Sequence, residues 1–165
     1  MIHITLPDGS IRSYDNIVTV MDVAKDISEG FARNVISAKF NDEIIETSSP
    51  LTFDGSLVLF TWKDQQGKQA FWHSSSHVLA QALEELYPGV KLWVGPAIDN
   101  GFYYDFSRKE PFTEDDLKKI EKKMAEIVDR DEKTHREVWK RDDAVKHFLK
   151  IGEKYNERFA EKVEV

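Results

Sequence analysis

The residues best suited to chemistry in this chain are two histidines four positions apart, His73 and His77, with the three serines 74–76 between them. In an α-helix, residues i and i+4 project from nearly the same side, so both imidazoles could reach one water, one substrate atom or one metal ion. Imidazole exchanges protons near neutral pH and binds metals. The pair therefore indicates hydrolysis or metal binding, with an ordinary surface role as the plain alternative.

The residues that follow predict the helix that would carry the pair. Leu79, Ala82, Leu83 and Leu86 recur at the spacing of one buried face, whereas Ala80 and Glu84 are expected near the histidine face. We therefore expect the histidines to avoid the core. The helix should end at Tyr87-Pro88-Gly89, residues that favour a turn.

Composition narrows the class of protein. The chain has 165 residues, 41% of them hydrophobic, no cysteine, and a formal net charge of -7. It is long enough for one medium domain or two small ones. Without cysteine there is no disulfide or thiolate nucleophile, and His, Asp and Glu are the remaining strong metal ligands. The negative charge argues against strong nonspecific binding to nucleic acid. No apolar run approaches the roughly 20 residues of a membrane span and no secretory signal is visible, so a cytoplasmic location is the default expectation.

A polar stretch from Lys63 to Gly67 predicts a boundary between residues 1–62 and 63–165. Residues 1–62 hold 4 Lys and Arg against 9 Asp and Glu, so the charge is uneven as well. In this first part, alternating residues predict a hairpin of 2–6 with 11–14, and strands at 35–40, 43–45 and 56–61. A helix capped by Thr19 and Asp22 and ended by Gly30 should lie between them. The order ββαβββ favours a ubiquitin-like β-grasp, suited to binding or docking.

The second part mixes strands and helices, which makes the whole chain α+β. A strand at 91–94, the corner Gly95-Pro96, a turn at Asp99-Asn100-Gly101 and an aromatic strand at 102–106 together predict a hairpin. Aromatic side chains there are packing residues or stacking partners for a base or ribose.

Two further helices are predicted. Thr113 and Asp116 should cap a helix with an apolar stripe and an ordinary solvated charged face, the stripe being Leu117, Ile120, Met124, Ile127 and Val128. After a strand at 134–139, Asp142 should cap a second helix, running through Leu149 to Gly152. His135 and His147 lack ligand-like spacing and are expected to be structural or surface residues.

Four segments together resemble the N-terminal region of bacterial threonyl-tRNA synthetases, over the whole chain. They are residues 4–10 (ITLPDGS), 21–24 (MDVA), 73–77 (HSSSH) and 95–105 (GPAIDNGFYYD). The resemblance implies that residues 1–62 are a TGS domain, a β-grasp module. It implies that residues 63–165 are part of the α+β editing domain of this class II synthetase family, cut short at its C-terminal side.

The resemblance also implies an activity. The synthetase joins threonine to its tRNA, using ATP and Mg²⁺ and a zinc ion, in a catalytic domain beyond residue 165. Serine lacks one methyl group of threonine, a difference worth only about 1 to 3 kcal/mol in a pocket. A second site therefore hydrolyses mischarged seryl-tRNA. By resemblance, His73 leads in that site by contacting the ribose or positioning the water, and His77 supports it.

Three more residues receive roles from the resemblance: Gly95, Pro96 and Tyr104 would contact the terminal adenosine or the seryl group. A later Cys-x-x-x-His segment that completes the family's pocket is absent from this sequence, and Asn156 follows Tyr155 where a lysine is expected. The chain alone is therefore expected to bind no cofactor or metal, to be inactive in aminoacylation and to be a monomer. Its full-length relative is expected to bind threonine tRNA by its 3′ adenosine end, to dimerise through the catalytic domain and to use no membrane.

Two alternatives remain open. The chain could be a TGS-type docking or regulatory module without chemistry. It could also be a freestanding metal-dependent aminoacyl-tRNA deacylase in which His73 and His77 hold zinc, although two imidazoles supply only half of a zinc site.

Overall fold

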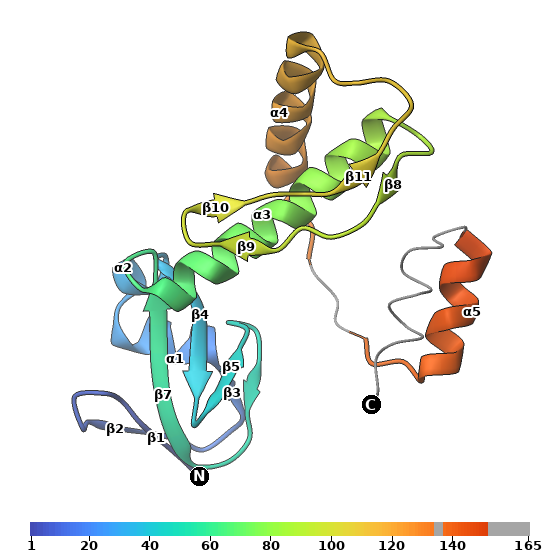
Figure 1. The fold of residues 1–165 in the computed structure, drawn as a ribbon. Coiled ribbons are helices and arrows are strands. Elements are labelled where there is room, and N and C mark those ends of the chain that lie inside the picture. Colours follow the sequence, from blue (N-terminus) through green and yellow to red (C-terminus); the bar gives the residue numbers. More distant parts are fainter. Residues whose placement is uncertain (134–136, 152–165) are drawn as a thin grey trace. The chain divides into compact units, whose positions relative to one another are not determined.

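The computed structural model describes residues 1–133 and 137–151, and its chain divides into two compact units, Met1–Trp72 and His73–Val165 (Figure 1). The division falls within helix α3 (Gln65–Leu86), whereas the boundary predicted from the sequence lies just before this helix.

The first unit is built on a five-stranded sheet with the strand order β2-β1-β7-β4-β5. These strands are β2 (Ile11–Tyr14), β1 (Ile2–Thr5), β7 (Gly55–Thr61), β4 (Val35–Phe40) and β5 (Glu43–Ile45). β1 pairs antiparallel with β2 and parallel with β7, and β4 pairs antiparallel with β5 and β7. The predicted hairpin and the three later strands are thus confirmed. Two short strands, β3 (Val18–Thr19) and β6 (Pro50–Leu51), form an additional pair.

Helix α1 (Val20–Ile27) begins where the sequence predicts. The Thr19 hydroxyl accepts from the Asp22 backbone N–H at 3.2 Å, and the Asp22 carboxylate accepts from the Thr19 N–H at 2.8 Å. The prediction that Gly30 ends this helix is wrong. α1 ends at Ile27, and Ser28 caps both this end and the start of the short helix α2 (Glu29–Ala32), which contains Gly30.

The core of the first unit lies between α1 and the sheet. Val20 and Val23 of α1 are fully buried against Ile4 and Leu57, which come from the adjacent central strands β1 and β7. The complete cluster is Ile2, Ile4, Leu6, Val20, Val23, Ala38, Phe40, Leu51 and Leu57. Alternation along β1 explains this, because Ile2 and Ile4 face the core while His3 is exposed.

A tight corner joins β7 to α3 inside the first unit. The Asp64 carboxylate accepts hydrogen bonds from the backbone N–H of Thr61 at 2.7 Å and from its hydroxyl at 3.0 Å. Gly67 lies so close to the Thr61 carbonyl that a Cβ at this position would overlap it. This corner therefore requires a residue without a side chain at position 67.

In the second unit, an irregular hairpin follows α3. Its outer pair is β8 (Lys91–Leu92) with β11 (Phe106–Ser107), and its inner pair is β9 (Ala97–Ile98) with β10 (Gly101–Phe102) around the predicted turn. The predicted strands 91–94 and 102–106 are each too long. Pro96 has no N–H to donate, so the ladder is interrupted there, and Tyr103–Asp105 lie outside any strand.

Helix α4 (Glu114–Asp129) carries the predicted capping box of Thr113 and Asp116. Ile120 and Ile127 are buried as expected, but Leu117 and Val128 are 58% and 64% exposed, so the predicted stripe is wrong for these two. Leu117 and Val128 lie at the exposed edge of the stripe, whereas Ile120 and Ile127 lie at its other, buried edge.

The core of the second unit joins α3, α4 and β8. It consists of Ala80, Leu83, Val90, Leu92 and Ile120, and Tyr104 and Phe106 of the hairpin pack against it. Of the described helices, none is long and apolar enough to cross a membrane.

Helix α5 (Arg141–Ile151) begins one residue before Asp142, so the prediction that Asp142 caps it is wrong. The Lys140 carbonyl accepts from the N–H groups of Asp143 and Ala144, which places Asp142 in the first turn. The predicted strand 134–139 is absent from its described part, residues 137–139. His135 and Gly152 lie outside the described residues.

Candidate functional site

His73 and His77 lie on successive turns of α3, and both are exposed, as the sequence predicts. Their Nε2 atoms are 3.1 Å apart, the ring centroids are 4.7 Å apart, and the ring planes meet at 84°. A contact of this length requires one ring to donate N–H and the other to accept it through a lone pair. The pair is therefore arranged to hold one proton between two nitrogens.

The electrostatics of the pair favour a neutral His77. Loss of water around its ring, and then the charge of nearby His73, lower the pKa of His77 below 6.5. A neutral imidazole can accept a proton at neutral pH. His77 is thus suited to the role of proton acceptor.

The helix surface beside the histidines differs from the sequence prediction at one residue. Ala80 was expected on the polar side, near the histidines, but it is 7% exposed and belongs to the core cluster. The hairpin after α3 explains this, because Leu92 of β8 and Val90 join Ala80 in that cluster. The polar face around the histidines is consequently narrower than the periodicity suggests.

Ser76 is the buried serine between the two histidines. It is 1% exposed, and its hydroxyl donates to the His73 carbonyl at 2.7 Å. This bond satisfies a hydroxyl that would otherwise be costly to bury.

The structure brings Gly95 and Tyr104 together. Tyr104 lies across Gly95 so closely that a Cβ there would overlap its ring, and Pro96 beside it is half-buried. Tyr104 also packs against the core cluster that contains Ala80, three residues after His77 on α3. The hairpin that carries Gly95 and Tyr104 therefore packs against the same core as the histidine helix. Contact of Gly95, Pro96 and Tyr104 with a substrate stays a prediction.

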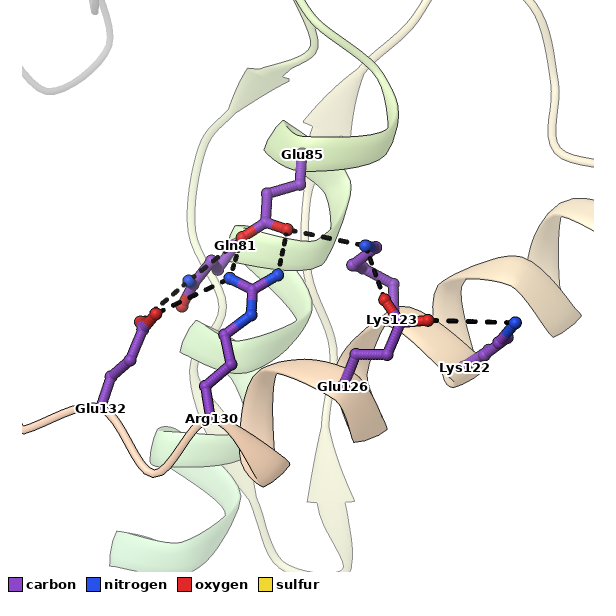
Figure 2. Close-up of polar contacts among 7 residues, drawn as sticks. All are labelled: Gln81, Glu85, Lys122, Lys123, Glu126, Arg130 and Glu132. Carbon is purple, nitrogen blue, oxygen red and sulfur yellow. Dashed lines mark hydrogen bonds and ion pairs between the residues drawn. The ribbon is translucent and has the colours of Figure 1, made fainter.

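Sequence reasoning missed a network of polar side chains farther along α3 (Figure 2). Arg130, which follows α4, donates to both oxygens of Glu85 at 2.7 Å. Lys123 of α4 lies 3.8 Å from Glu85 and 2.7 Å from Glu126. The charged face of α4 is thus partly paired with α3 rather than simply solvated. The signal that could have revealed it is the recurrence of polar residues at every fourth position: His73, His77, Gln81 and Glu85.

Metal ligands are sparse in the described part of the chain. Residues 1–133 and 137–151 contain no group of three or more His, Cys, Asp or Glu that could hold an ion. The zinc interpretation of His73 and His77 gains no third ligand from these residues. Asn156 lies outside them.

Comparison with known proteins defines the class first. The TGS domain family matches residues 2–61, which confirms the predicted ubiquitin-like β-grasp fold of the first unit. The chain therefore contains a TGS domain, at residues 2–61.

The relatives then specify the family. The chain is 66% identical over 78% of its length to a threonine–tRNA ligase of Flavobacterium johnsoniae, of which it covers 20%. It is 49% identical over 97% of its length to that of Pelagibacter ubique, covering 25%, and 45% identical over 99% to that of Thiobacillus denitrificans, covering 26%. The chain belongs to the threonyl-tRNA synthetase family and corresponds to its N-terminal region. It spans between a fifth and about a quarter of the length of these curated relatives.

Proposed function

We propose that this chain serves as the N-terminal region of a threonine–tRNA ligase and contributes part of a site that hydrolyses mischarged seryl-tRNA. The observation that supports the site best is the 3.1 Å contact between the Nε2 atoms of His73 and His77. Two imidazoles that share one proton, one of them with a lowered pKa, suit the proton transfers of ester hydrolysis.

In the proposed reaction, His77 removes a proton from a water whose oxygen attacks the seryl carbonyl carbon. The bond from that carbon to the ribose oxygen then breaks, and the proton passes to the departing ribose oxygen, leaving serine and uncharged tRNA. His73 holds the water or the ribose and accepts a hydrogen bond from Nε2–H of His77, which leaves the lone pair on Nδ1 of His77 for the proton of the water. The imidazoles leave this cycle in the protonation states in which they entered it.

The hairpin supplies the proposed binding surface. The ring of Tyr104 is held against Gly95, beside Pro96, and can offer one face or its hydroxyl to the terminal adenosine or the seryl group. Discrimination against threonine would come from exclusion of its extra methyl group, since binding differences of one methyl are small.

The ligase reaction, with its use of ATP, Mg²⁺ and zinc, is proposed for the part of the relatives' length that this chain does not cover. Dimerisation is proposed for the same part. The described residues offer no three-ligand group for zinc, so no step of that reaction is assigned to them. Threonine tRNA is the proposed partner and the cytoplasm the proposed location, with this chain alone a monomer.

The first test is a titration of the isotope-labelled chain with a nonhydrolysable seryl-3′-aminoadenosine analogue, followed by NMR. We expect shifts at His73, His77 and Tyr104 with the seryl analogue and weaker shifts with the threonyl analogue. No response to either would contradict the assignment of the site to this chain.

A second test separates the proposal from the two alternatives. In a full-length ligase that carries this sequence as its N-terminal region, His73→Ala should cause seryl-tRNA to accumulate, while charging with threonine is retained. A docking module without chemistry predicts no accumulation. A metal-dependent deacylase predicts that a chelator abolishes deacylation by the unmodified enzyme, whereas the proposed mechanism predicts that a chelator leaves deacylation unchanged.

A further inference from the structure

Gln81 continues the line of polar residues that starts with the two histidines. It is half-buried and lies one helical turn after His77 on α3. Each step of four residues turns the helix by only about 40°, so Gln81 and His77 are neighbours on one face. A ligand that reaches His77 from solvent therefore has Gln81 beside it.

The orientation of the Gln81 amide follows from its partners. Its Nε2 lies 3.3 Å from an oxygen of Glu85 and 3.4 Å from an oxygen of Glu132 (Figure 2). Carboxylates only accept hydrogen bonds, so the amide nitrogen must face them. The Gln81 Oε1 atom takes part in neither of these two contacts and is a hydrogen-bond acceptor.

The partners of Gln81 are themselves fixed. Glu85 receives two parallel hydrogen bonds from Arg130 at 2.7 Å, and Arg130 also lies 3.7 Å from Glu132. Paired N–H donors of a guanidinium define the plane of the carboxylate that they hold. The two carboxylates that orient Gln81 are thus bound to one guanidinium, which limits the rotation of the amide.

We propose that Gln81 is a further substrate-binding residue, whose Oε1 accepts a hydrogen bond from the α-ammonium group of an aminoacyl ester. This inference rests on the proposed function. An ester of serine presents one primary ammonium close to its carbonyl, and an amide oxygen one turn from His77 can receive it. Such a contact orients the carbonyl toward the water held by the histidines.

The test uses the whole labelled chain and two probes, the seryl-3′-aminoadenosine analogue and the same molecule without its amino group. With the unmodified chain, the side-chain NH₂ signals of Gln81 should shift with the first probe and much less with the second. Gln81→Met keeps the length of the side chain and removes the acceptor. It should bind the seryl probe about tenfold more weakly, since a hydrogen bond to a charged group is lost.

The control is Gln66→Met, at an exposed glutamine in the first turn of the same helix, which should bind both probes as the unmodified chain does. Equal affinities of Gln81→Met and the unmodified chain, with His73 and His77 still shifting, would overturn the role of Gln81 and leave the proposed function intact. No shift at the histidines with either probe would overturn both. The Gln81 signals of the unmodified chain test the inference even if Gln81→Met fails to fold.

Discussion

At the scale of single residues, the central feature is the contact between the Nε2 atoms of two histidines, His73 and His77. The Nε2 atoms lie 3.1 Å apart, so a proton on one nitrogen is hydrogen-bonded to the other. Adding a second proton would place two like charges at this distance and remove the acceptor. The pKa of His77 is therefore lowered, first by the loss of water around its ring and then by the charge of His73.

This pKa shift predicts how stability depends on pH. The folded pKa of His77 lies below 6.5, so between that pKa and 6.5 the unfolded chain binds more protons and the free energy of unfolding rises with pH. His77→Gln should reduce this rise, measured by urea unfolding between about pH 5 and pH 7. Carboxyls such as Glu85, whose folded pKa is about 2, add a rise of their own near pH 5, where the unfolded chain still binds some protons, but they add it to both chains and cancel in the comparison. An equally steep rise in His77→Gln would contradict the prediction.

At the scale of elements, α3 depends on the corner from which it starts. Thr61 ends β7, Asp64 accepts two hydrogen bonds from it, and Gly67 lets the first turn of α3 approach the Thr61 carbonyl. His73 and His77 lie farther along the same helix.

Gly67→Ala tests this corner. Alanine normally favours a helix over glycine, yet here its Cβ would overlap the backbone carbonyl of Thr61, which cannot rotate away. We expect a loss of about 1–3 kcal/mol in the free energy of unfolding, typical of overpacking. The matched control is Gly30→Ala in α2, where a Cβ would meet only the Ser28 hydroxyl oxygen at 3.6 Å. It should be stabilising by about 0.4–1 kcal/mol. Equal effects of the two substitutions in urea unfolding would refute the account of the corner.

At the scale of the whole molecule, each unit has a core of its own. Every buried residue of the first core cluster lies between Ile2 and Leu57, and every one of the second unit's cluster lies between Ala80 and Ile120. A unit with a closed core can fold without its neighbour.

A polypeptide of residues 1–72 should therefore fold by itself. We expect one cooperative unfolding transition and amide chemical shifts for residues 2–60 that superimpose on those of the whole chain. NMR and urea unfolding measure both. A collapsed spectrum with little dispersion would show that the first unit depends on residues beyond Trp72.

The sequence by itself determined those features that rest on local physics. Alternation gave strands β1, β2, β4, β5 and most of β7, and the Thr19 and Thr113 capping boxes gave the starts of α1 and α4. The i, i+4 spacing of His73 and His77 placed both rings on one exposed face. Each of these follows from neighbours within a few residues, which is why a single sequence contains the information.

Only the tertiary structure decided the rest, because it depends on residues far apart in the chain. Burial of Ala80 requires β8 to cover α3. Leu117 is exposed because α4 contacts the core through Ile120 and Met124 instead. The contact of Tyr104 with Gly95 requires the interrupted hairpin, and the orientation of Gln81 requires Glu132, fifty-one residues away in the sequence. Helical spacing brings the two imidazoles to one face, whereas the surroundings of that face come from segments that local patterns do not connect.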